Sequence, residues 1–288
     1  MAGSDAQRRG TLLATMGVVA LSFDALLVRL AVADAATVIY WRGLFMALAM
    51  TGVLRAWRGV WTWQSLRRSG WAAGATSAGF AATLVLFVLA VLNTRVANVV
   101  VILAAVPLFA ALLSGVFLRE WVPPRTWVAM ALCVAGILLV FGGSLDFGGW
   151  LGDLFALGAA LAAASNFTLL RRSPGTDRLA IVAGGGALAW LLVLPLASPL
   201  AVTAPGFAAL AIMGLVQMPL ALALLGEATR YLPSAEVSLF LLVETVLGTL
   251  WVWLFLGEEP PGATLVGGGL ILVTLAGHAA WGLYRDPG

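Results

Sequence analysis

The sequence predicts an all-α membrane protein with ten transmembrane helices arranged as two five-helix inverted repeats. The first observation is composition: 62% of the 288 residues are hydrophobic and 10% are charged, whereas a soluble domain carries about 25% charged residues. The second is that the apolar runs are continuous and about twenty residues long, which is the length of a bilayer-crossing helix and unlike the alternating pattern of a barrel strand. The third is an internal repeat within the chain.

The apolar runs define the expected helices in chain order. They are residues 11–32, 36–54, 71–92, 96–118, 126–141, 150–170, 179–198, 206–226, 234–256 and 263–283. The breaks between them are rich in arginine, proline and glycine, as in "RAWRGVWTWQSLRRSG" (55–70), "REWVPPR" (119–125) and "GEEPPG" (257–262). The first run is longer than the apolar region of a signal peptide and carries Asp24 and Arg29, so we expect a retained first helix.

Two segments of the first half return in the second half. "VPLFAALLSGVFLRE" (106–120) parallels "ETVLGTLWVWLFLGE" (244–258), and "ALSFDALLVR" (20–29) parallels "AASNFTLLRR" (163–172). Each half then holds five helices, and because five is odd the second half enters from the opposite face of the membrane. The sequence therefore predicts two repeats, 1–145 and 146–288, that together form one transport domain.

The arginines set the expected orientation. The chain has 16 arginines and no lysine, and most of the arginines fall at the ends of the expected helices that share a side with both chain termini. Since positive residues concentrate on the cytoplasmic side, both termini are expected in the cytoplasm of a bacterial inner-membrane protein. The basic isoelectric point follows from this asymmetry and does not indicate a nucleic-acid partner.

The two parallel segments at 106–120 and 244–258 resemble the drug/metabolite transporter superfamily of the EamA type, over almost the whole chain. Helix 4 of that family commonly carries Thr-Pro and helix 9 Glu-Pro, each followed by Gly-Glu at the helix end. Pro107 matches the first motif, Glu244 the second, and Glu120 and Glu258 the terminal acids. Two departures are Thr245 in place of the helix-9 proline and Arg119 in place of the glycine. The YddG-type aromatic amino-acid exporters are one candidate subgroup.

Glu244 is the most unusual residue, since it lies about halfway along an apolar helix. A charged side chain at the bilayer centre costs about 2.5–3.5 kcal/mol on insertion scales. One interpretation is a carboxyl group that binds a substrate amine or a proton. The other is a protonated acid that hydrogen-bonds to a neighbouring helix and locks the packing.

Asp24 and Arg42 are expected to form an ion pair. Both lie about two turns from the same short loop, so they are at similar depth, and an unpaired charge there would be costly. The pair is either static and closes the outer end, or it opens and presents Arg42 to a substrate carboxylate.

The remaining polar residues inside the expected helices are amides and hydroxyls. Asn98, Asn166 and Gln217 either hold helices together or form a polar ring around an apolar cavity. The family resemblance implies that helices 3, 4, 8 and 9 line the central pathway, beside helices 1 and 6. Carried over residue by residue, the implied pathway comprises Phe80, Thr83, Asn98, Pro107, Gln217, Ser238 and Glu244, and Asn166 is added from its depth in helix 6.

The sequence favours a transporter over an intramembrane enzyme or a structural membrane protein. A single histidine rules out H-E-x-x-H, "GGWLGD" (148–153) lacks the spacing of an aspartyl intramembrane protease, and there is no Walker loop for ATP. An inverted repeat with polar groups at mid-membrane is typical of secondary transporters. We expect export of a small amphipathic substrate by alternating access, with no cofactor or metal, driven by the substrate gradient or by protons. The preferred substrate is an amino acid with an aromatic or large apolar side chain, and the alternative is a drug-like cation.

Overall fold

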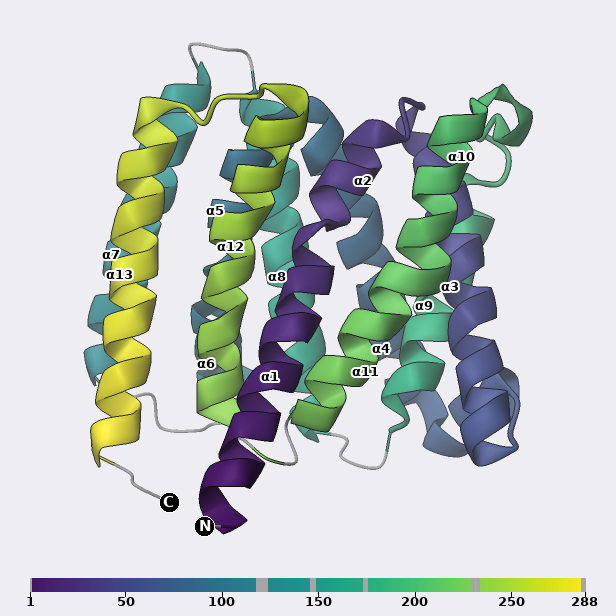
Figure 1. The fold of residues 1–288 in the computed structure, drawn as a ribbon, viewed down its shortest axis with the longest axis horizontal. Coiled ribbons are helices and arrows are strands. Elements are labelled where there is room, and N and C mark those ends of the chain that lie inside the picture. Colours follow the sequence, from purple (N-terminus) through teal and green to yellow (C-terminus); the bar gives the residue numbers. More distant parts are fainter. Residues whose placement is uncertain are drawn as a thin grey trace.

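The computed structural model describes residues 2–117, 124–145, 149–172, 176–228, 231 and 234–285. Helices run through almost all of this part of the chain, and it contains no strand. They stand side by side as one bundle, with both termini at the same end (Figure 1). We call this the terminal end and the opposite one the far end.

The helices follow the expected spans in order. They are α1 (Ala2–Ser22), α2 (Asp24–Leu30), α3 (Ala35–Arg58), α4 (Thr62–Asn93), α5 (Val96–Leu103), α6 (Val106–Phe117), α7 (Pro124–Leu145), α8 (Trp150–Arg172), α9 (Arg178–Val193), η1 (Pro199–Ala201), α10 (Ala204–Ala211), η2 (Ile212–Gln217), α11 (Met218–Ala228), α12 (Ser234–Leu256) and α13 (Gly262–Arg285). Within the described residues, six spans are long and apolar enough to cross a membrane, and shorter apolar helices stand at the other four expected positions. The predicted all-α membrane fold is confirmed.

Three expected spans are interrupted near their middle. The first helix breaks at Phe23 between α1 and α2, and the fourth breaks at Ala104 and Ala105 between α5 and α6. Pro107 explains the second break, since a proline has no N–H for the carbonyl of residue 103. In the eighth helix, η2 is a π-helical stretch between α10 and α11, a feature that often marks functional sites.

The segment 55–70 was expected to be a loop, and this was wrong. α3 continues to Arg58 and stops where Gly59 adopts a left-handed φ of 68°, a conformation that glycine tolerates best. α4 then begins at Thr62, with Trp61 as its N-cap and the Gln64 side chain accepting the Trp61 N–H. The polar composition that suggested a loop belongs to helix ends at the membrane surface.

The packing partners have the symmetry of an inverted repeat. α1 packs on α11 and α12, and α8, which holds the corresponding place in the second half, packs on α4 and α6. α3 packs on α9, and α7 packs on α13, so each of these helices meets its own counterpart. The division of the chain at residue 145 stays a prediction.

The contact between α3 and α9 lies where such a two-fold axis would pass. Asp34 and Asp177 are 143 residues apart, and each caps the first turn of its helix with its side chain. Gly43 and Gly186 have the same separation and touch reciprocally. A Cβ on Gly43 would lie 2.6 Å from the Gly186 carbonyl oxygen, and one on Gly186 would lie 2.8 Å from the Gly43 carbonyl oxygen. Only glycine permits this approach of two backbones.

Candidate functional site: a central cavity

A cavity of about 330 Å³ lies in the middle of the bundle. Its walls are mostly apolar and include three phenylalanines, Phe80, Phe87 and Phe167. The ionisable residues among the described lining residues are Asp24, Arg42 and Glu244, which come from α2, α3 and α12. The remaining lining residues are Leu21, Ser22, Ala25, Thr83, Leu84, Val100, Leu103, Ala104, Val106, Ala163, Met218, Thr245 and Gly248. An apolar cavity with a few convergent polar groups is the usual form of a small-molecule site.

The helix interruptions border this cavity. Residues 21–25 flank the break at Phe23, residues 103–106 flank the α5–α6 break, and Met218 follows directly after η2; each contributes to the lining. Irregular backbone at membrane depth is tolerated where it lines a cavity or is buried in protein. Transporters use such broken helices at mid-membrane to build substrate sites.

Asp24 and Arg42 form an ion pair in the cavity wall. The Arg42 Nη2 donates to Asp24 Oδ2 at 2.8 Å, and the two residues are only 7% and 4% exposed. The Arg42 guanidinium also lies 5.1 Å from the centre of the Phe87 ring, a cation–π contact. Two buried polar atoms of this pair, Asp24 Oδ1 and Arg42 Nε, have no hydrogen-bond partner in the described structure.

Neighbouring side chains support the break in the first helix. The Gln217 amide, at the end of η2, donates from Nε2 to the carbonyl oxygens of Ala20 and Leu21 at 3.0 and 3.2 Å. These carbonyls lie in the last turn of α1, where a helix leaves its acceptors unsatisfied. The Phe23 ring stacks on Trp251 of α12 with 4.8 Å between ring centres, and Trp251 Nε1 donates to Ser22 Oγ at 2.9 Å.

The residues predicted for the pathway fall into three groups. Phe80, Thr83 and Glu244 line the cavity, as do Asp24 and Arg42. Three amides lie elsewhere: Gln217 supports α1, Asn98 is at the far end, and Asn166 is buried with its Oδ1 close to Gly79. The side chains of Pro107 and Ser238, together with Arg119 and Glu120, are outside the described part of the chain.

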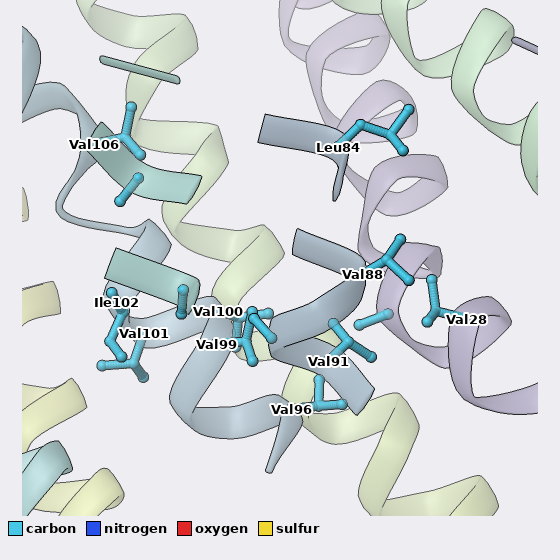
Figure 2. Packing of buried hydrophobic residues seen from close by; sticks show 14 of the residues in the cluster. Val28, Leu84, Val88, Val91, Val96, Val99, Val100, Val101, Ile102 and Val106 are labelled. Atoms are coloured by element: carbon cyan, nitrogen blue, oxygen red, sulfur yellow. The ribbon is translucent and has the colours of Figure 1, made fainter. Parts of the chain in front are cut away.

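A layer of valines separates the cavity from the far end. Val28 of α2 lies beside Val88 and Val91 of α4, and Val96 and Val99 of α5 lie close by (Figure 2). All five are fully buried. Along each helix they lie between cavity-lining residues and far-end residues, so buried apolar side chains of α2, α4 and α5 stand between the cavity and the far end.

Charged residues form a second closing layer beyond the valines. Arg29 Nη2 lies 3.2 Å from Glu258 Oε2 and also donates to the Thr94 carbonyl oxygen at 2.7 Å. Glu258 in turn accepts the backbone N–H of Val96 at 2.8 Å. These bonds join α2, the turn between α4 and α5, and the end of α12. A second cavity of about 350 Å³, lined by Arg29, Arg95 and Asn98 among others, lies at this end.

A buried hydrogen-bond network around Asp153 was not predicted from the sequence. Asp153 of α8 has no exposed surface, and its Oδ1 accepts from Thr94 Oγ1 at 2.7 Å and from Asn98 Nδ2 at 3.1 Å. Thr264 of α13 donates to Asn98 Oδ1. The available signal was an acid in the first turn of an apolar helix opposite a polar turn, "NTRVAN" (93–98), but "GGWLGD" was compared only with a protease motif. Phe87 and Phe167, which line the cavity, and Trp251, which stacks on Phe23, were not among the residues predicted for the pathway.

Comparisons with known proteins agree with this architecture. A solved crystal structure is similar over 96% of this chain and 99% of its own, with a TM-score of 0.66 and 18% sequence identity; a likeness at this identity shows the fold alone. No curated protein is significantly similar in sequence. The model of the EamA-like transporter family matches residues 8–142 and 150–278, once in each half. The chain is therefore a multi-pass membrane transporter that belongs to the EamA-like transporter family.

Proposed function

We propose that this chain is a secondary transporter that exports small amphipathic metabolites, with aromatic or large apolar amino acids as the preferred class. The observation that carries the proposal is the central cavity, where apolar walls surround one guanidinium and two carboxyl groups. Its volume of about 330 Å³ is at the lower end of the roughly 300–1,000 Å³ common for small-molecule sites.

The arrangement of charges suits a zwitterion. A substrate carboxylate would accept from the Arg42 guanidinium, and a substrate ammonium would donate to the Asp24 carboxyl group. Arg42 Nε and Asp24 Oδ1 are buried without a partner in the described structure, so the two side chains must turn toward the cavity to offer these atoms. Phe80, Phe87 and Phe167 offer aromatic surface to an apolar side chain. Binding would thus satisfy buried polar atoms that otherwise carry a desolvation penalty.

We propose alternating access as the mechanism. The far end is closed by the valine layer and by the Arg29–Glu258 pair, so release on that side requires both layers to separate. Rocking of the two repeats about the cavity would separate them while the cavity closes toward the terminal end. In this proposal the terminal end faces the cytoplasm of a bacterial inner membrane, and the substrate gradient or protons supply the energy.

A second candidate function is efflux of amphipathic cations. It is favoured by the excess of acids in the cavity, because Arg42 already pairs with Asp24 and Glu244 is a further carboxyl group in the lining. The two candidates differ in whether the substrate needs a carboxylate.

Counterflow in proteoliposomes separates them. Labelled phenylalanine and tryptophan would be compared with phenethylamine and tryptamine, which lack only the carboxylate. We expect counterflow of the amino acids. Preferential counterflow of the amines would instead establish efflux of amphipathic cations. Phe80→Ala should weaken exchange of either class, whereas Phe141→Ala, a phenylalanine of α7 outside the cavity lining, serves as the matched control. Exchange of none of the four compounds would contradict this substrate class.

A further inference from the structure

The segment that joins α3 to α4 carries a surface that the transport pathway does not use. α3 ends at Arg58, and Thr51 of α3 hydrogen-bonds to Thr62 at the start of α4, so the two helix ends lie together. Gly70 has φ of 70° and ψ of −160°. These angles are not helical, so residues 62–69 form a short helical piece set off from the rest of α4. In Figure 1 this region lies at the terminal end of the bundle.

Arginine dominates this surface. The sequence contains no acid between Ala35 and Arg119. Arg58 is paired with Asp177, with Nη1 to Oδ2 at 2.7 Å. Arg55, Arg67 and Arg68 are exposed, and no ion pair with a carboxylate is found for any of them among the described residues. The surface therefore has a local excess of positive charge.

Tryptophans accompany these arginines. Trp57, Trp61, Trp63 and Trp71 are 72%, 49%, 55% and 78% exposed. The Arg55 guanidinium lies 5.6 Å from the Trp61 ring centre, and that of Arg67 lies 5.1 Å from the Trp63 ring centre. Tryptophan is favoured at the level of lipid headgroups, so we expect the guanidinium groups of Arg55 and Arg67, which contact these rings, to lie near the lipid phosphates. We call these three arginines and four tryptophans the Arg–Trp patch.

We propose that the Arg–Trp patch binds anionic phospholipids of the leaflet at the terminal end. Guanidinium groups pair with phosphate through parallel hydrogen bonds, and indole rings pack at the junction between headgroup and acyl chain. Clusters of basic residues next to a transmembrane helix are a known form of anionic-lipid recognition. The positive charge of the patch complements the net negative charge of an anionic lipid. A zwitterionic lipid has no net charge, and only its phosphate can pair with the arginines.

The test uses native mass spectrometry of the full-length protein in neutral detergent with equal amounts of phosphatidylglycerol and phosphatidylcholine. The wild-type protein should retain phosphatidylglycerol in preference. The triple variant Arg55→Gln/Arg67→Gln/Arg68→Gln should lose this preference, with affinity reduced roughly tenfold or more. The matched control is Arg8→Gln/Arg9→Gln/Arg178→Gln, which removes the same charge from exposed arginines outside the patch.

Three further results decide the proposal. Arg55→Lys/Arg67→Lys/Arg68→Lys should keep much of the preference that the glutamine variant loses, because it keeps the positive charge and removes only the planar guanidinium groups. Equal loss in the patch variant and the control would overturn the site, since it would show a diffuse charge effect. Equal retention of both lipids by the wild-type protein would also overturn it. The thermal unfolding of each variant in phosphatidylcholine alone shows whether it remains folded.

Discussion

Asp24 and Asp153 are both buried acids at helix N-termini, but their surroundings differ. Asp153 is satisfied by neutral donors, with Thr94 and Asn98 supplying its hydrogen bonds. Asp24 is paired with a charged arginine, and one of its carboxylate oxygens has no partner in the described structure. The network around Asp153 joins the ends of four helices, whereas Asp24 lines a cavity.

The difference shows two roles for a buried carboxyl group: one joins helices, and the other lines a cavity. A buried polar group normally finds partners for its hydrogen-bonding atoms, and the Asp153 network follows that rule and joins α4, α5, α8 and α13. The central pair departs from it at two atoms. Its two unsatisfied atoms are buried beside a cavity that both residues line, which is the reason to propose a ligand for that cavity.

Breaking the central pair should have the largest effect. Asp24→Asn leaves the Arg42 guanidinium buried without a counter-charge, which should lower the free energy of unfolding by about 3–5 kcal/mol. The double variant Asp24→Asn/Arg42→Gln should recover part of this loss. Denaturant unfolding in detergent measures both, and additive losses in the double-mutant cycle would argue against the contact.

Removing the Asp153 carboxyl group should cost somewhat less. Asp153→Ala leaves the Thr94 and Asn98 donors without their acceptor, and we expect a loss of about 2–3 kcal/mol. Asp153→Asn keeps one acceptor oxygen and should cost less. If Asp153 has only a structural role, a folded Asp153→Asn protein should keep the substrate preference of the wild type in counterflow. A changed preference would contradict a purely structural role for Asp153.

The Arg29–Glu258 pair should contribute little to stability but should bias the far end toward closure. Its side chains are 27% and 22% exposed, and partly exposed pairs contribute about 0–1 kcal/mol. Glu258→Gln removes the charge that pairs with Arg29, so it should increase opening of the far end. The measurement is labelling of a Thr83→Cys cavity reporter by an impermeant thiol reagent added on the far-end side. The Thr83→Cys reporter should be labelled faster with Glu258→Gln than with Glu258 unchanged. The control is Glu259→Gln, which should leave the rate unchanged, because Glu259 contacts Arg95 through its backbone oxygen.

Glu244→Gln should give the smallest effect. Glutamine preserves the shape and a hydrogen-bond donor but cannot titrate, so a packing role predicts nearly normal exchange with unchanged pH dependence. Counterflow and accumulation driven by a pH gradient are measured in the same proteoliposomes. Loss of pH-driven accumulation with intact exchange would make Glu244 the proton-coupling residue. Its role would then be functional, like the one proposed for Asp24.

The sequence predicted the helices well, because apolar runs of membrane-spanning length allow few other structures. The contact of Asp24 with Arg42 followed from their equal depth and the cost of burying either charge alone. The helix breaks at Phe23 and in η2 could not be predicted, since hydropathy does not report the hydrogen-bond register of the backbone.

The placement of the amides was also beyond the sequence. Asn98 and Gln217 were expected near the pathway from their position along the chain, but the direction of a side chain depends on the rotation of its helix. Asn98 turns toward Asp153, a residue of the other half, and Gln217 turns toward the carbonyls of α1. Neither partner is apparent from local sequence.

The reciprocal contact of Gly43 and Gly186 has an evolutionary consequence. Two helices related to each other by a two-fold axis meet at equivalent residues, so the contact needs no difference between its members. A five-helix chain inserted in both orientations could make the same contact with an inverted second copy of itself. Duplication and fusion of its gene would then turn a concentration-dependent homodimer into one polypeptide, in which the effective concentration of the partner is fixed. The reciprocal glycine contact is of the kind that such a homodimer would make.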